Sequence, residues 1–188
     1  MTGTTVHIPR LETERLILRA PAMSDFEPFM DVLETDRSAF VGGPTPRRQS
    51  MRGFGHVAGL WVTRGYSLFV LDRRDAPGAP IGMAGPWHPV IWPELEFGWS
   101  LWDAAHEGQG FVTEAMRAIM PWAWDTTGTD TAVSFIDADN PRSIQVARAL
   151  GARPDEDMTE EMNEPGSPFH DAEGARVQVW RHRKEALQ

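Results

Sequence analysis

The residues best suited to chemistry form a short glycine-containing turn, Glu107-Gly108-Gln109-Gly110-Phe111-Val112-Thr113-Glu114, between an expected strand and an expected helix. Two glycines at alternate positions allow a sharp backbone turn and the close approach of a ligand. The N–H groups that follow are the unpaired donors of a helix N-terminus, where the helix dipole also favours an anion. The turn therefore fits a phosphate group, although an ordinary glycine-rich connection with Thr113 near the helix cap fits the spacing equally well.

Two other phosphate motifs fit this turn less well. No Gly-Lys-Ser/Thr sequence is present, and the only lysine of the chain is Lys184, which argues against a Walker-type nucleotide site. Gly108-x-Gly110-x-x-Thr113 lacks the third glycine of a dinucleotide fingerprint and sits in mid-chain without paired βαβ units. A nucleotide-binding protein is therefore disfavoured.

Elements on both sides of the turn would hold it in place. A strand is expected at 95–101 and a helix from 113 to about 125, with Pro121 as a kink or as the end of its regular part. A short strand at 132–136 and a helix from Asn140 to Gly151 follow, with Asn140 as N-cap and a proline at the first helical position. The strand–helix–strand run predicts a right-handed crossover between two parallel neighbours.

The first half of the chain is predicted to add antiparallel strands. Strands are expected at 15–19, 66–71 and 81–87, the last two as a hairpin, and Ser24 begins a helix through a capping box with Glu27. A last strand is expected at 176–181. No repeat or linker divides the sequence, so residues 1–188 are predicted to form one α/β (α+β) domain around a mixed sheet.

Composition excludes several classes of function. The chain has 188 residues and no cysteine, which rules out disulfides, thiolate metal sites and a cysteine nucleophile, and we expect no metal. A formal net charge of −9 argues against a nucleic-acid partner, because phosphate backbones need a basic patch. Without an apolar run near the ~20 residues of a membrane span, and without a signal pattern, we expect no membrane partner and a cytoplasmic location.

The negative charge is concentrated in one segment, residues 154–175. It contains eight carboxylates and neither lysine nor arginine, which leaves a net charge of −1 for the rest of the chain. We expect a loop-like segment. Its field could concentrate a cationic substrate, or it could be a solvated loop without a role, since charge runs usually face water.

Four motifs follow one another along the chain. They are Leu11-Glu12-Thr13-Glu14-Arg15-Leu16-Ile17-Leu18-Arg19, Phe97-Gly98-Trp99-Ser100-Leu101, Gly108-Gln109-Gly110-Phe111-Val112-Thr113-Glu114-Ala115, and Asp139-Asn140-Pro141-Arg142-Ser143-Ile144 leading to Leu150-Gly151-Ala152. In this order they resemble the GNAT superfamily of acyl-CoA N-acyltransferases, and in particular its branch of ribosomal-protein N-terminal acetyltransferase-like proteins. The resemblance runs from about residue 9 to 153 and includes the last strand. The resemblance implies a mostly antiparallel central sheet with helices on both faces, and acetyl-CoA as co-substrate.

The turn departs from the family pattern at two positions. The pattern Gln/Arg-x-x-Gly-x-Gly/Ala begins here with the acidic Glu107 and ends with the β-branched Val112. Ala152 also stands where an aromatic residue commonly follows Leu-Gly. The change at Glu107 removes a side chain that often helps to hold the pyrophosphate, so we expect weaker CoA binding and an unaffected fold.

The resemblance also assigns residues to CoA. Pantetheine would lie between the two parallel strands, which splay apart in this family. The residues implied are Gly108, Gln109, Gly110, Phe111, Val112 and Thr113 for the pyrophosphate, backbone groups of Ser100, Leu101 and Trp102 for pantetheine, and Asn140 and Ser143 near CoA.

In this superfamily the amine attacks the thioester directly, without an acyl-enzyme. The protein then has to deprotonate the amine, stabilise an oxyanion and protonate a thiolate. Glu96 is the candidate base, directly or through water, with Glu94 and His88 in reserve; an edge carboxylate in solvent is the alternative. Many relatives use a tyrosine near the last helix as the general acid, but the only tyrosine of this chain, Tyr66, lies far upstream. Ser143 is therefore the candidate acid; the alternative is a serine that only forms local hydrogen bonds with the backbone.

The acceptor is expected to be a primary amine, either a protein N-terminus or a small molecule. Trp87, Trp92, Trp99 and Trp102 bracket the strand at 95–101 and could wall an acceptor pocket or simply fill the core. His106, beside the turn, is expected at the surface. A non-catalytic acyl-CoA-binding module is the alternative function, and both a monomer and a homodimer remain open.

Overall fold

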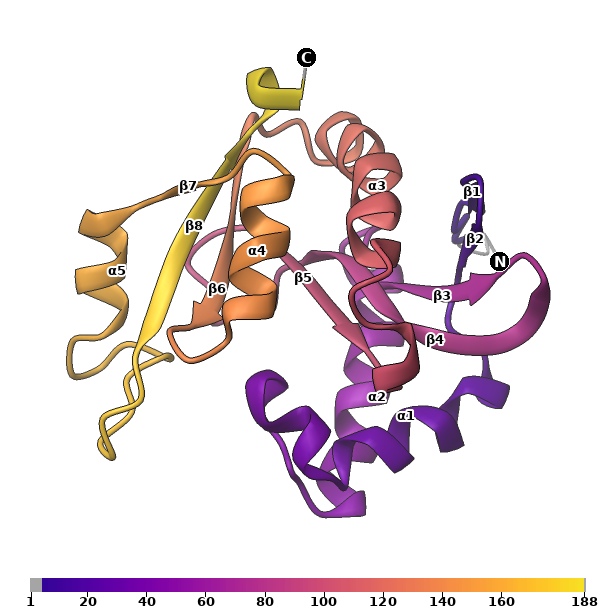
Figure 1. The fold of residues 1–188 in the computed structure, drawn as a ribbon, viewed down its shortest axis with the longest axis horizontal. Helices are drawn as coiled ribbons and strands as arrows, with labels where there is room; N and C mark the ends of the chain where they lie inside the picture. The colour runs from indigo at the N-terminus through magenta and orange to yellow at the C-terminus, as the bar shows by residue number, and fades with distance from the viewer. Residues whose placement is uncertain (1–4, 188) are drawn as a thin grey trace.

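A computed structural model describes residues 5–187 of the chain, which fold around one twisted sheet of eight strands in the order β1-β2-β3-β4-β5-β6-β8-β7 (Figure 1). The strands are β1 (Leu11–Glu12), β2 (Leu16–Arg19), β3 (Phe69–Arg73), β4 (Ala76–Trp87), β5 (Glu96–Leu101), β6 (Thr131–Asp137), β7 (Arg153–Pro154) and β8 (Val177–Arg183). β5 and β6 are parallel and the other neighbours are antiparallel. The predicted mixed, mostly antiparallel sheet with a β5–helix–β6 crossover is confirmed.

Five α-helices and four short 3₁₀ helices complete the described fold. They are α1 (Phe26–Leu33), α2 (Arg47–Thr63), α3 (Phe111–Thr127), α4 (Pro141–Ala149) and α5 (Glu156–Met162), with η1 (Met23–Asp25), η2 (Asp36–Val41), η3 (Ala104–His106) and η4 (Lys184–Leu187). The strand predicted at 66–71 is displaced and begins only at Phe69.

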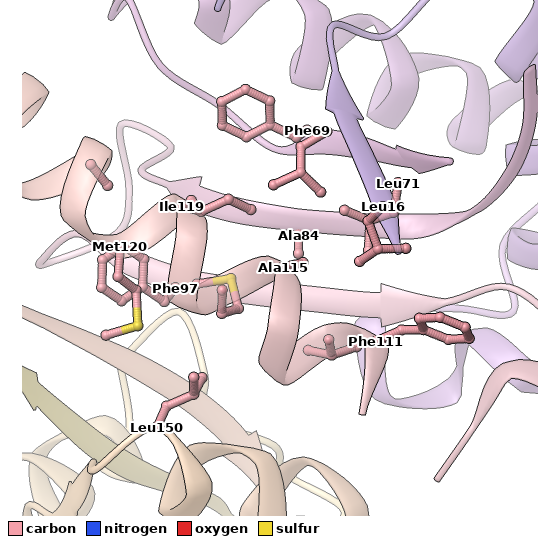
Figure 2. Close-up of a cluster of buried hydrophobic side chains, with 14 of the residues drawn as sticks. Leu16, Phe69, Leu71, Ala84, Phe97, Phe111, Ala115, Ile119, Met120 and Leu150 are labelled. Carbon is pink, nitrogen blue, oxygen red and sulfur yellow. The ribbon is translucent and has the colours of Figure 1, made fainter. Parts of the chain in front are cut away.

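Helices cover both faces of the sheet, as predicted. Side chains alternate along β3, so Phe69 and Leu71 pack in the cluster beneath α3, whereas Val70 packs in the cluster of α1 and α2. Figure 2 shows Ala115, Ile119 and Met120 of α3 lying on the strand residues of the first cluster. α4 shares that face, while α5 packs on the opposite face through Met158 and Met162.

Three local expectations differ from the structure. The acidic segment is not a plain loop, because it contains α5, whose two methionines are buried against β8. Of the two outcomes expected at Pro121, a kink or the end of the regular helix, the second is wrong, because α3 continues to Thr127 and Pro121 lies on the exposed face, where the carbonyl that loses its partner can meet water. The N-cap of α1 is Asp25 rather than Ser24, and the buried Asp25 carboxylate is bound by Arg19 at 2.7 Å.

Candidate active site

The two parallel strands separate shortly after they meet, and their arrows diverge in Figure 1. They share one register pair in the described chain, Glu96 with Val133, and the Val133 N–H donates to the Leu95 carbonyl at 2.9 Å. Just beyond, the Ser134 hydroxyl donates to the Phe97 carbonyl at 2.6 Å, where a backbone bond would continue a regular ladder. The strands therefore form a fork that opens after Phe97.

A buried histidine supports the serine at this fork. His182 Nε2 lies 3.0 Å from Ser134 Oγ. Because the serine proton points to the Phe97 carbonyl, the imidazole has to donate from Nε2. Burial lowers the pKa of His182 to about 4, so the ring is neutral near pH 7. A neutral chain of hydrogen bonds thus fixes the point at which the strands part.

The glycine turn leaves backbone donors open at the start of α3. Gly108 and Gly110 have φ of 70° and 77°, a left-handed conformation that glycine adopts without steric cost. Gly110 is the N-cap of α3, and no side chain of the described chain caps this end. A Cβ added at Gly108 would meet nothing within 4 Å, so the turn faces open space. This geometry fits an anion such as a pyrophosphate.

The N-terminal motif clamps this turn. Glu114, in the first turn of α3, accepts hydrogen bonds from the Thr13 hydroxyl at 2.6 Å and from the Arg15 N–H at 2.8 Å. Arg15 also donates to the Gln109 carbonyl at 3.0 Å, and its guanidinium lies 4.5 Å from the centre of the Phe111 ring. Two motifs that are far apart in the sequence therefore hold the helix start together.

Glu107, the unusual acidic residue of the turn, lies between two arginines. Its carboxylate accepts from Arg37 Nη2 at 2.7 Å and pairs with Arg142. Arg37 also donates to the carbonyls of Trp102 at 3.0 Å and Leu101 at 3.2 Å. These cations, Arg37 foremost, lower the pKa of Glu107. The acidic substitution therefore brings two guanidinium groups beside the turn, a feature that the sequence had not suggested.

A cavity of about 560 Å³ opens at the fork and reaches both faces of the sheet. Alternation along β5 places Phe97 and Trp99 in the clusters of α3 and α4, so Glu96 lies on the face of α1 and α2. Because the strands have parted, Glu96, Trp99 and Ser143 all line the same cavity. The turn 108–113 lies outside this lining.

Glu96 lies in the cavity wall, partly exposed to the cavity. Its Oε2 accepts from Trp92 Nε1 at 2.6 Å, and the backbone of Phe135 also bonds to it. Loss of water raises the pKa of Glu96 to about 7, although both bonds act to lower it. A Cβ at Gly98 would lie 3.9 Å from Glu96 Oε1, so this glycine leaves room beside the carboxyl group.

The first turn of α4 brings Asn140 and Ser143 to the cavity. Asn140 is the N-cap, as predicted, and its Oδ1 accepts from the Ser143 N–H at 3.1 Å. The Ser143 hydroxyl accepts from Trp99 Nε1 at 3.2 Å rather than bonding to nearby backbone. The hydroxyl proton therefore remains available for a further acceptor.

The three positions expected to bond pantetheine differ in their surroundings. Ser100 and Trp102 line the cavity, whereas Leu101 does not. The Trp102 N–H donates to the Ile81 carbonyl at 2.9 Å, and its carbonyl accepts from Arg37. A ligand that bonds to the Trp102 backbone would have to exchange one of these partners.

The reserve candidates have other partners. Glu94 forms an ion pair with Arg181, with distances of 2.8 and 3.1 Å. His88 Nδ1 lies 3.3 Å from the Tyr66 hydroxyl, and burial lowers the pKa of His88. Neither Glu94 nor His88 lines the cavity. His106 is half-buried beside Phe111 rather than fully at the surface.

The four tryptophans take part in both the cavity and the core. All of them line the cavity, and Trp102, which is 8% exposed, also packs in the cluster of α1 and α2. Phe169 had not been singled out, although its ring centre lies 4.9 Å from Trp92 and 4.1 Å from Phe135. It comes from the acidic segment, and nothing in its local sequence spacing indicates that it returns to the site.

This architecture is that of an acyl-CoA-dependent acyltransferase: a splayed parallel pair, a glycine turn at a helix start and a cavity through the fork. Residues 15–153 match the family model described as "Acetyltransferase (GNAT) domain". The chain belongs to the GNAT acetyltransferase family, and acetyl-CoA is its co-substrate.

Solved structures agree with this assignment. An acetyltransferase from Agrobacterium tumefaciens str. C58 is 33% identical, with a TM-score of 0.80, over 97% of this chain and 99% of that one. A GNAT-family acetyltransferase from Bacillus anthracis is 14% identical, with a TM-score of 0.71, over 94% and 99% of the two chains. RimL, a ribosomal L7/L12 alpha-N-protein acetyltransferase in complex with coenzyme A, is 16% identical, with a TM-score of 0.68, over 93% and 97%.

Helices long and apolar enough to cross a membrane are absent from residues 5–187.

Proposed function

We propose that this enzyme acetylates a primary amine by direct attack, with Glu96 as general base and Ser143 as general acid. The observation that carries the proposal is a carboxyl group with a pKa of about 7 in the wall of a cavity that also reaches the first turn of α4. A base of this pKa is half ionised at neutral pH and can both take up and release a proton.

Residues on both sides of the fork are proposed to hold the co-substrate. Acetyl-CoA supplies the acetyl group as an activated thioester. The open N–H groups of the turn would hold the pyrophosphate at the start of α3, with the charges of Arg37 and Arg142 close by. The residues proposed to bind it are Ser100, Leu101, Trp102, Gly108, Gln109, Gly110, Phe111, Val112, Thr113, Asn140 and Ser143.

The two proton transfers are proposed to take place on opposite sides of the fork. The amine would approach from the face of α1 and α2, where Glu96 takes its proton either directly or through a water molecule. Trp92 holds one carboxyl oxygen, which orients the other beside the space at Gly98. Ser143 lies on the other face and, as the C–S bond breaks, would give its proton to the departing thiolate; Ser143 would then regain a proton from water, and Glu96 would release its proton to water.

Thiol release from acetyl-CoA in the presence of a panel of primary amines tests this proposal. The chain has no cysteine, so the background of the assay is low. We expect thiol release to depend on the amine and the product to be the N-acetyl amine. If CoA raises the melting temperature but no amine supports thiol release, amine acetylation is wrong and CoA binding alone remains.

A further inference from the structure

We infer that the acceptor is an amine with an aromatic body and no carboxylate, of the arylalkylamine class. This inference rests on the proposed function, because it assumes that the amine reaches Glu96 in the cavity. The cavity then has to accommodate whatever the amine carries. Its lining therefore indicates the chemistry of that body.

Aromatic side chains surround the carboxyl group. Trp92 donates to Glu96 at 2.6 Å, and Phe169 packs edge-on against Trp92 with ring centres 4.9 Å apart. Phe169 in turn stacks on Phe135 at 4.1 Å with an interplanar angle of 26°. All three rings line the cavity and keep part of their surface exposed. Partly exposed rings around a concave site are the usual wall of a pocket for an apolar ligand.

A second apolar wall comes from the helical segments that cover this face of the sheet. Phe29 of α1 and Trp87 of β4 line the cavity, together with Phe40 and Val41 of η2. Phe40 and Val41 are each 49% exposed, although both are large apolar residues. An aromatic body between the two walls would remove this surface from water, which is a favourable change.

Charged groups in the described lining are few and mostly acidic. They are Glu96, Asp137, Asp171 and Arg176, and the last two are exposed to solvent. Three carboxylates against one arginine favour a cationic amine over a zwitterion. A peptide would also have to bury backbone N–H and carbonyl groups against rings that cannot bond to them, which is costly.

Matched acceptors test the inference: 2-phenylethylamine, ethylamine, phenylalanine and a tetrapeptide with N-terminal serine. We expect kcat/KM for 2-phenylethylamine to exceed that for ethylamine by about 10- to 100-fold, the effect of burying one ring. Phenylalanine and the peptide are expected to fall below 2-phenylethylamine. With CoA saturating, 2-phenylethylamine is also expected to raise the melting temperature more than ethylamine does.

Two variants test where the aromatic ring of the acceptor binds. Phe169→Ala and Phe40→Ala are each expected to lower kcat/KM for 2-phenylethylamine about 5- to 10-fold, with ethylamine nearly unchanged. Met51→Ala is the control, because Met51 is an apolar residue of similar exposure, 52%, outside the cavity lining. Phe40 lies on an exposed 3₁₀ helix, so its variant is the one expected to fold normally.

The outcomes separate this inference from the proposed function. Equal rates for ethylamine and 2-phenylethylamine, or a faster reaction with phenylalanine or the peptide, would overturn the arylalkylamine assignment and leave amine acetylation standing. No thiol release with any of the four amines would overturn the arylalkylamine assignment, and no release across the wider panel of primary amines would overturn amine acetylation as well.

Discussion

The proposed CoA side and the proposed acceptor side of this site consist of different kinds of group. On the CoA side, the main-chain donors come from one short turn, and Glu107 and Glu114, within a few residues of it, pair with arginines from distant parts of the sequence. On the acceptor side, aromatic side chains that are far apart in the sequence, among them Trp92, Phe135 and Phe169, line the cavity together with Glu96. The first side can recognise a group common to every CoA ester, whereas the second can vary with the acceptor.

Because of this difference, substitutions on the two sides should have different effects. A main-chain site fails when its backbone conformation is changed, and a side-chain site fails when one chemical group is removed. Changes on the CoA side should therefore alter CoA affinity for every acceptor. Changes on the acceptor side should alter turnover or acceptor choice and leave CoA binding intact.

The largest effect is expected from Glu96→Gln. Turnover should fall by about 10²–10⁴-fold, because the variant has no base, while CoA affinity stays nearly unchanged. The loss should shrink at high pH, where the amine is deprotonated in solution. Steady-state kinetics and a CoA titration measure both effects, with Glu94→Gln as the matched control, since Glu94 pairs with Arg181 outside the cavity. A variant that keeps wild-type turnover would remove Glu96 from the mechanism.

The next largest effect is expected at the glycine turn. Gly110→Val places a Cβ at a φ of 77° and beside the expected pyrophosphate, so CoA affinity should fall about 10-fold or more. Gly128→Val is the control, because Gly128 has a φ of 69° at the other end of α3. Both variants should lose similar stability in urea. Equal CoA affinity in the two variants would mean that the pyrophosphate binds elsewhere.

Glu107→Gln is expected to have a smaller effect of opposite sign. Removing this carboxylate leaves Arg37 and Arg142 uncompensated beside the turn, so CoA should bind about 2- to 5-fold more tightly at low salt. The gain should disappear at high ionic strength. Isothermal titration at two salt concentrations measures it. Weaker binding would instead show that Glu107 is needed to orient the two arginines.

The smallest effect concerns the acidic segment. Asp171 lines the cavity, whereas Glu160, Glu161 and Glu164 do not. We therefore expect Asp171→Asn to lower kcat/KM for a cationic acceptor about 2-fold at low salt, and to flatten its salt dependence. Replacement of the three glutamates by glutamine is the control and should change the slope less. If the triple glutamate variant changes the salt dependence more than Asp171→Asn does, the carboxylates of α5 and of the residues just after it attract the cationic acceptor.

The sequence predicted the crossover, the turn and the N-cap at Asn140 because each depends on local geometry. Glycine spacing, a proline after an asparagine and apolar periodicity act over a few residues. α5 was missed because only Met158 and Met162 in it are apolar enough to bury, and their partner strand β8 follows much later. The same reason hid Arg37, Phe40 and Phe169, which reach the site only through tertiary packing.

The pH dependence of turnover, measured with both substrates saturating, tests the role of Glu96 most directly. Burial raises the pKa of Glu96 to about 7, and a base acts only when it is unprotonated. Wild-type kcat should therefore rise with pH through about 7 and then level off. Glu96→Gln should lose this inflexion and show only a low rate that follows the ionisation of the amine. The same inflexion near pH 7 in both proteins would contradict the assignment of Glu96 as the base.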